Sequence, residues 1–264
     1  MEWWTAYLAV GAMAGFLAGL LGVGGGLIIV PSLIFLFNSQ HFPQTHLLHL
    51  ALGTSLACIM FTSVSSLRTH HAHGAVNWKI VRRIAPGIVI GTLLGSGLAA
   101  LLSSSFLALF FAVFVSFAAT QILLDIKPKP SRQLPGRAGT FLVGIIIGII
   151  FSLVGGGGAI LSVPFMLYCN IKTHDAIGTS AAIGFPIAIS GAAGYILTGL
   201  AQENLPPLSL GFIYLPALLG LMVTSVFTAP FGAKLTHRMP VERLKKIFAV
   251  FLYIIAAKML AGLF

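Results

Sequence analysis

Two glycine runs mark the places where this chain could bind an anion. They lie within residues 22–31 and 155–164, and an apolar segment that contains a proline follows each run. One glycine costs a helix roughly 1 kcal/mol relative to alanine, so clustered glycines should stop a helix. The next helix would then start with unpaired N–H groups and a partial positive charge. The pattern therefore predicts two helix starts that can hold an anion.

A second repeated motif could add hydroxyl donors to these backbone amides. Gly-Thr-Ser occurs at residues 53–55 and again at 178–180, and serine and threonine hydroxyls can donate to an oxyanion. The alternatives are back-bonding of the hydroxyls to the carbonyl four residues earlier and close helix packing at the glycines. The predicted substrate-binding residues are Gly24, Gly25, Gly26, Thr54, Ser55, Gly157, Gly158, Ala159, Thr179 and Ser180.

Histidines form a second group of candidates. His49 and His174 occupy matching places ahead of the two Gly-Thr-Ser motifs, where they could act as gate or proton groups or as interfacial hydrogen-bonding residues. Three more histidines lie at residues 70–73 without a nearby carboxylate, and a hydrated loop explains them better than a metal site. We expect no metal, no cofactor and no enzymatic activity.

The acidic residues argue against a cation carrier. All five lie near segment ends, whereas carboxylates within spans mark many cation and proton paths. The chain also has no nucleotide-binding P-loop, so ATP is not the direct energy source.

Composition places these residues in a membrane. The chain has 264 residues, of which 58% are hydrophobic and only 8% charged, whereas soluble domains carry about 25% charged residues. The net charge of +10 comes from short loops between apolar segments, so it indicates topology and lipid contact rather than nucleic-acid binding. We therefore expect a multi-pass membrane protein.

Ten apolar segments follow one another along the chain. Most approach the ~20 residues that a membrane span needs, whereas residues 27–37 and 159–169 would form helices of only about 16 Å. The predicted segments are 5–21, 27–37, 47–67, 84–102, 106–124, 139–154, 159–169, 176–198, 208–230 and 244–264.

The two halves of the chain look like a duplication. The motif at residues 49–55 returns at 174–180, and Phe-Ala-Val-Phe at 111–114 returns at 248–251. We expect repeats at residues 1–124 and 139–264, joined by a cytoplasmic linker at 125–138. Suppose that each repeat contains three transmembrane helices and a glycine-broken pair of segments that enters the membrane and returns to the same side. Fourteen of the fifteen lysines and arginines then share one face. Cytoplasmic loops are rich in Lys and Arg, so this all-α architecture with inverted repeats is preferred.

The glycine-rich block at residues 19–31, its copy near residue 155 and the two Gly-Thr-Ser motifs resemble the sulfite exporter TauE/SafE family. The resemblance covers nearly the whole chain and implies an inner-membrane permease for small sulfur-containing anions or organosulfonates. In that family, about eight spans are usual.

The expected function is therefore secondary transport of a small anion such as sulfite or sulfoacetate, by alternating access around the two glycine breaks. An anion channel and a non-transporting membrane scaffold are the alternatives. The expected partners are the anion and the lipid bilayer. The sequence does not indicate the identity of the anion, the direction of transport, the coupling ion or the oligomeric state.

Overall fold

The computed structural model describes residues 2–21, 25–124, 128, 129, 131–236 and 242–261, and it confirms an all-α membrane fold. Helices account for nearly all of the regular structure. They are α1 (Glu2–Leu21), α2 (Gly26–Ser39), α3 (Leu47–Ala72), α4 (Trp78–Leu101), α5 (Ser104–Leu123), α6 (Arg137–Val154), α7 (Ala159–Tyr168), α8 (Thr173–Gly199), α9 (Leu215–Thr236) and α10 (Glu242–Ala261).

Six helices in the described ranges are long and apolar enough to cross a membrane: α3, α4, α5, α6, α8 and α9. Two helices are much shorter, with 14 residues in α2 and 10 in α7. At 1.5 Å per residue these measure about 21 and 15 Å, less than the ~30 Å hydrocarbon core. Short helices after both glycine runs were predicted, and they are present.

One predicted segment was wrong in its first seven residues. Residues 208–214 are mostly apolar and were assigned to a helix that begins at 208, but they form an antiparallel hairpin of β1 (Ser209–Leu210) and β2 (Ile213–Tyr214). Two residues of this turn, Leu208 and Gly211, have positive φ angles, which a right-handed helix does not allow. Hydrophobicity alone could not separate this extended segment from a helix.

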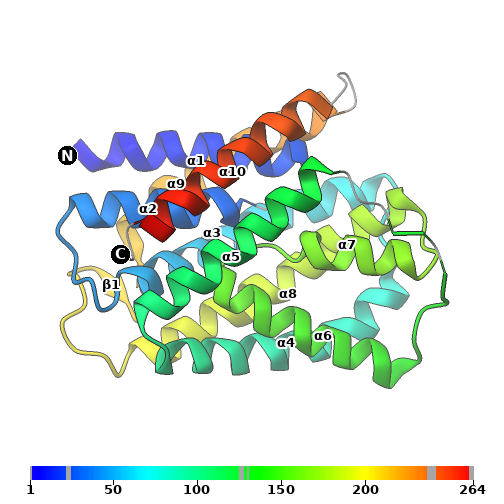
Figure 1. The fold of residues 1–264 in the computed structure, drawn as a ribbon, viewed down its shortest axis with the longest axis horizontal. Helices are drawn as coiled ribbons and strands as arrows, with labels where there is room; N and C mark the ends of the chain where they lie inside the picture. Colours follow the sequence, from blue (N-terminus) through cyan, green and yellow to red (C-terminus); the bar gives the residue numbers. More distant parts are fainter. Residues whose placement is uncertain (1, 22–24, 125–127, 130, 237–241, 262–264) are drawn as a thin grey trace.

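The described helices run between two ends of the molecule (Figure 1). We call the right-hand end of that view, where α3 ends and α4, α6 and α8 begin, the basic end. Arg82 and Arg137 lie within the first two turns of α4 and α6 there. The opposite end carries the connections α2–α3, α4–α5 and α8–α9. The α1–α2 pair opens at that opposite end, whereas the α6–α7 pair opens at the basic end (Figure 1).

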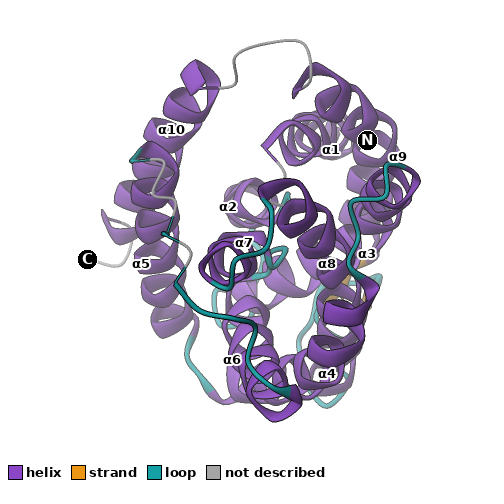
Figure 2. Cartoon of the chain, turned by 90° about the vertical axis from the view of Figure 1, so that its right-hand side faces the viewer, coloured by secondary structure: helices purple, strands orange, loops and turns teal. Residues whose placement is uncertain are grey.

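Helices from the two parts of the chain pack against each other in pairs. The most extensive contacts join α1 to α9, α4 to α6, α3 to α8, α4 to α8 and α5 to α10. Glycines make the first two contacts close, because a Cβ at Gly11 would overlap the backbone of Leu221 and one at Gly91 would overlap Ile145. The short helices α2 and α7 lie in the centre, surrounded by the others (Figure 2).

Candidate functional site

The first glycine run ends at a helix start inside the protein. Helix α2 begins at Gly26, and Gly25 precedes it as the N-cap residue. Both glycines are buried, and the carbonyl of Gly25 accepts the first helical bonds from the N–H groups of Ile28 and Ile29. Gly24 was also predicted to bind the anion, but it lies outside the described residues. The described part of this break therefore has the expected form.

The second glycine run ends one helix and starts another. Gly155 follows α6 with φ 63° and ψ 31°, a left-handed conformation that favours glycine and commonly ends helices. Gly158 is the N-cap residue of α7, which begins at Ala159. Gly157 and Gly158 are buried, whereas Ala159 is half-buried. The chain thus turns within four glycines inside the core.

The two breaks touch each other. A Cβ added at Gly26 would overlap the carbonyl oxygen of Gly155 and the Cα of Gly156. A side chain at Gly155 would meet Leu52 and Val30, each about 3 Å away. Only glycines allow the backbones to approach this closely. The runs that lie 130 residues apart in sequence therefore form one structural unit.

Neither short helix has a side-chain cap within the described residues. The N-cap residues of α2 and α7 are both glycines, which have no side chain to accept from the first-turn amides. By contrast, α4 begins at the end of a span, and the Asn77 side chain accepts from the N–H groups of Lys79 and Ile80. A helix start that is buried and uncapped is unusual, and a ligand is one way to satisfy its amides.

Three serines surround the breaks. The Ser55 hydroxyl donates to the carbonyl oxygen of Gly155 over 2.7 Å, and so its proton stabilises the second glycine run. The Ser180 hydroxyl lies 2.8 Å from the hydroxyl of Ser162, which is on the first turns of α7. All three side chains are buried. The Ser162–Ser180 bond uses one of the two hydroxyl protons, which leaves the other proton for a further acceptor.

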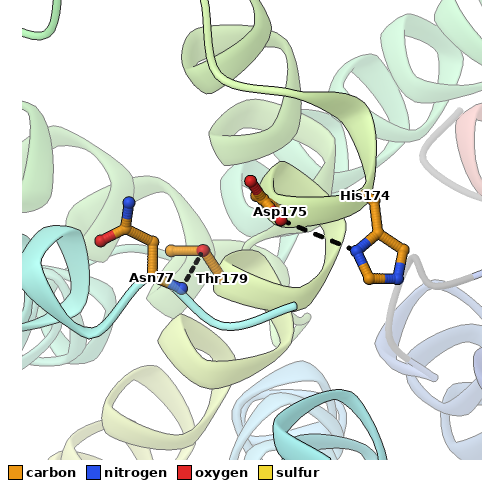
Figure 3. Close-up of polar contacts among 4 residues, drawn as sticks. All are labelled: Asn77, His174, Asp175 and Thr179. Atoms are coloured by element: carbon orange, nitrogen blue, oxygen red, sulfur yellow. Dashed lines mark hydrogen bonds and ion pairs between the residues drawn. The ribbon is translucent and has the colours of Figure 1, made fainter. Parts of the chain in front are cut away.

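The two threonines of the Gly-Thr-Ser motifs make matching bonds elsewhere. Thr54 Oγ1 accepts from the backbone N–H of Tyr214 at 3.0 Å, just before α9. Thr179 Oγ1 accepts from the backbone N–H of Asn77 at 2.9 Å, just before α4 (Figure 3). Each threonine therefore supports the start of a helix in the other half of the chain. Both threonine oxygens accept from backbone N–H groups that lie outside the glycine runs.

The two candidate histidines lie in different surroundings. His49 is buried, its ring stacks on Phe212, and its Nε2 lies 2.9 Å from the carbonyl oxygen of Ala99. In the described chain its Nδ1 has no partner, and the residue lines a cavity of about 360 Å³ at the opposite end. His174 is 63% exposed, and its Nδ1 lies 3.7 Å from Asp175 (Figure 3). Only His49 could act from inside the protein.

Sequence reasoning missed Ser162. The residue stood inside the second glycine–proline block, but one serine in an apolar helix gave no reason to choose it. Aligning the two blocks on Pro31 and Pro164 would have provided a signal, because Ser162 then stands opposite Ile29. A polar residue in only one of two similar blocks points to a special role.

Comparison with known proteins agrees with this architecture. The family model for the sulfite exporter TauE/SafE matches residues 7–259. The chain is 41% identical to a "probable membrane transporter protein" from Haemophilus influenzae over 253 residues, which cover 96% of each chain. It is 29% identical to the "probable membrane transporter protein YdhB" from Bacillus subtilis, across 91% of this chain and 92% of that one. The protein is therefore a member of the sulfite exporter TauE/SafE family.

Proposed function

We propose that this protein is a secondary permease for small anions, which bind where the two glycine breaks meet. The observation that carries the proposal is the start of α7, where buried, uncapped amides lie next to the Ser162–Ser180 pair. Gly26, the first residue of α2, contacts Gly155 and Gly156 of the second run, which supports a site shared by the two breaks. Two helix starts, each with about half a positive charge, then favour an anion.

The chemistry of the site suits sulfur oxyanions and organosulfonates. A sulfite or sulfonate group has three oxygens that can accept separate bonds from first-turn amides and from the free serine proton. The described serines and glycines provide no full positive charge, so binding would be modest and release easy. Sulfite and sulfoacetate are therefore the first substrates to test.

We propose that transport follows alternating access between inverted halves. The α1–α2 pair opens at one end of the molecule and the α6–α7 pair at the other, which fits such a relation (Figure 1). The described part of the basic end includes Arg82, Arg83 and Arg137, so it would face the cytoplasm. A cysteine at Gln40 should then be labelled from outside, and one at Ser131 only from inside. Labelling of both positions from the same side would contradict the inverted arrangement.

Flux measurements in proteoliposomes test the function. Vesicles loaded with sulfite, thiosulfate, sulfoacetate or taurine should show protein-dependent efflux that saturates with concentration for at least one of these compounds. Efflux that rises linearly without saturation would indicate an anion channel. A folded protein that moves none of these compounds would favour a scaffold, or a permease for an anion of another class.

A further inference from the structure

A second feature of the basic end is a cavity that the proposed transport site does not include. The cavity has a volume of about 580 Å³ and lies between the first turns of α4 and α6. Four of its six lining residues are cations, and all four are exposed at the surface. The lining consists of Lys79, Arg82, Arg83, Arg137, Ala138 and Phe141.

The positive charge of this cavity is not neutralised within the described chain. Its lining includes no carboxylate. Among the described residues, the ion pair that forms joins His174 to Asp175, and neither of these residues lines the cavity. Helices α4 and α6 run parallel, since Gly87 packs on Phe141 and Gly91 on Ile145. Both helix N-termini therefore lie beside the cavity and add their partial positive charges to the four cations.

The surroundings place the cavity at the surface of the bilayer. Trp78, the first residue of α4, is 40% exposed, and exposed tryptophans gather at the level of lipid headgroups. From there both helices continue toward the bilayer with exposed apolar side chains. These are Ile90 and Leu94 on α4, with 44% and 59% exposed, and Leu142 and Ile146 on α6, with 58% and 57% exposed.

We propose that this cavity binds the phosphate headgroup of an anionic phospholipid, whose acyl chains lie along the exposed faces of α4 and α6. Arginine presents paired donors that match phosphate geometry, and the cavity offers three arginines and one lysine. A phosphatidylcholine headgroup carries its own cation and gains less from this potential. Phosphatidylglycerol, which has a net negative charge, is the probe that fits.

Quenching of Trp78 fluorescence by brominated lipids can measure this preference. The chain has three tryptophans, so replacing Trp3 and Trp4 with phenylalanine leaves Trp78 as the only tryptophan. In phosphatidylcholine bilayers, brominated phosphatidylglycerol should quench Trp78 at lower mole fractions than brominated phosphatidylcholine. In the same single-tryptophan background, Arg82→Gln combined with Arg83→Gln should reduce the preference for phosphatidylglycerol by roughly ten- to thirtyfold.

Two controls separate the cavity from the general charge of this end. Arg68→Gln with Lys172→Gln removes two cations that do not line the cavity, and the preference should remain. Arg137→Gln changes the other helix and should weaken the preference by about fivefold, which gives a second test if the double variant does not fold.

Three results would overturn the proposal. The first is equal quenching by both lipids in the unmodified cavity. The second is an equal loss of preference in the Arg68/Lys172 control. The third is complete loss of the preference in about 50 mM inorganic phosphate but not in chloride of equal ionic strength, because the cavity would then select free phosphate rather than a lipid. None of these results depends on which anion the protein transports.

Discussion

The two glycine breaks share their backbone plan but differ in polarity. Each places a glycine at the N-cap of a short helix, Gly25 before α2 and Gly158 before α7. Four residues later, the first break has the fully buried Ile29, whereas the second has the buried Ser162. The serines next to the two breaks, Ser55 and Ser180, therefore have different hydrogen-bond partners.

This difference suggests a division of roles. Position 29 is an isoleucine, which offers Ser55 no hydroxyl partner, and Ser55 donates to the carbonyl oxygen of Gly155. Ser180 meets the hydroxyl of Ser162, and their bond leaves one proton unused. We infer that the first break supports the second, and that the second break contacts the anion.

The largest expected effect follows from breaking the contact between the two runs. Gly26→Ala should greatly reduce folded protein, because the new Cβ would overlap the carbonyl of Gly155 and neither backbone can move aside. Overpacking of this kind typically costs about 1–3 kcal/mol of unfolding free energy. The measurement is the thermal unfolding midpoint in detergent.

Gly25→Ala is the matched control for that change. Its Cβ would lie 3.2 Å from Cδ1 of Ile29, the mobile end of a side chain, so the variant should remain folded. Equal unfolding midpoints for the two variants would show that the close contact at Gly26 has no energetic importance.

The next effect concerns the anion itself. The double variant Ser162→Ala/Ser180→Ala should raise the KM for sulfite roughly tenfold to a hundredfold, because a hydrogen bond to a charged group contributes about 1.5–3 kcal/mol. Each single variant keeps one hydroxyl proton and should raise KM much less. Initial rates of sulfite flux in proteoliposomes provide KM. A normal KM in a folded double variant would place the anion elsewhere.

Ser55→Ala should change stability rather than affinity. Its hydroxyl donates to a buried carbonyl oxygen, and leaving that acceptor unpaired costs about 1–3 kcal/mol. The KM for sulfite should stay within about threefold of the unmodified value, which is less than one lost charge-assisted bond would cause. A large rise in KM at normal stability would show that both breaks bind the anion directly.

The smallest effect should be the same in both halves. Thr54→Val and Thr179→Val each remove the acceptor of one backbone N–H, so each should lower the unfolding free energy by about 1 kcal/mol and leave KM unchanged. Serine at either position keeps the acceptor oxygen and should restore most of the loss. Unequal losses for the two valine variants would indicate that the halves are not equivalent at these bonds.

Much of the fold could be predicted because membrane constraints act locally. Length and hydropathy located ten helices, and the glycine runs located the starts of α2 and α7 within one residue. The hairpin at residues 209–214 was not predicted, because the hydropathy of its apolar residues is the same in an extended and in a helical conformation. Its extended form depends on Gly211 and on packing against Tyr195 and Gly53, which are distant in sequence.

The candidate site was harder to predict, because its geometry depends on contacts between the halves. The sequence grouped Thr54 with Ser55 as donors, since the two residues are adjacent. In the structure their hydroxyls diverge, one to the N–H of Tyr214 and the other to the carbonyl of Gly155. Neighbouring residues on a helix point about 100° apart, and only tertiary structure shows what each one meets.

The pairing of α1 with α9 has a consequence for synthesis at the ribosome. The glycine face of α1 packs on residues near Leu221, which are translated almost 200 residues after α1 ends. Translation proceeds at about 5–20 residues per second, so the glycine face of α1 lacks its partner α9 for roughly 10–40 s. During that interval lipid or a membrane insertase must cover the glycine face of α1. A chain released before α9 should therefore become a substrate for membrane proteases, even though its first helices are complete.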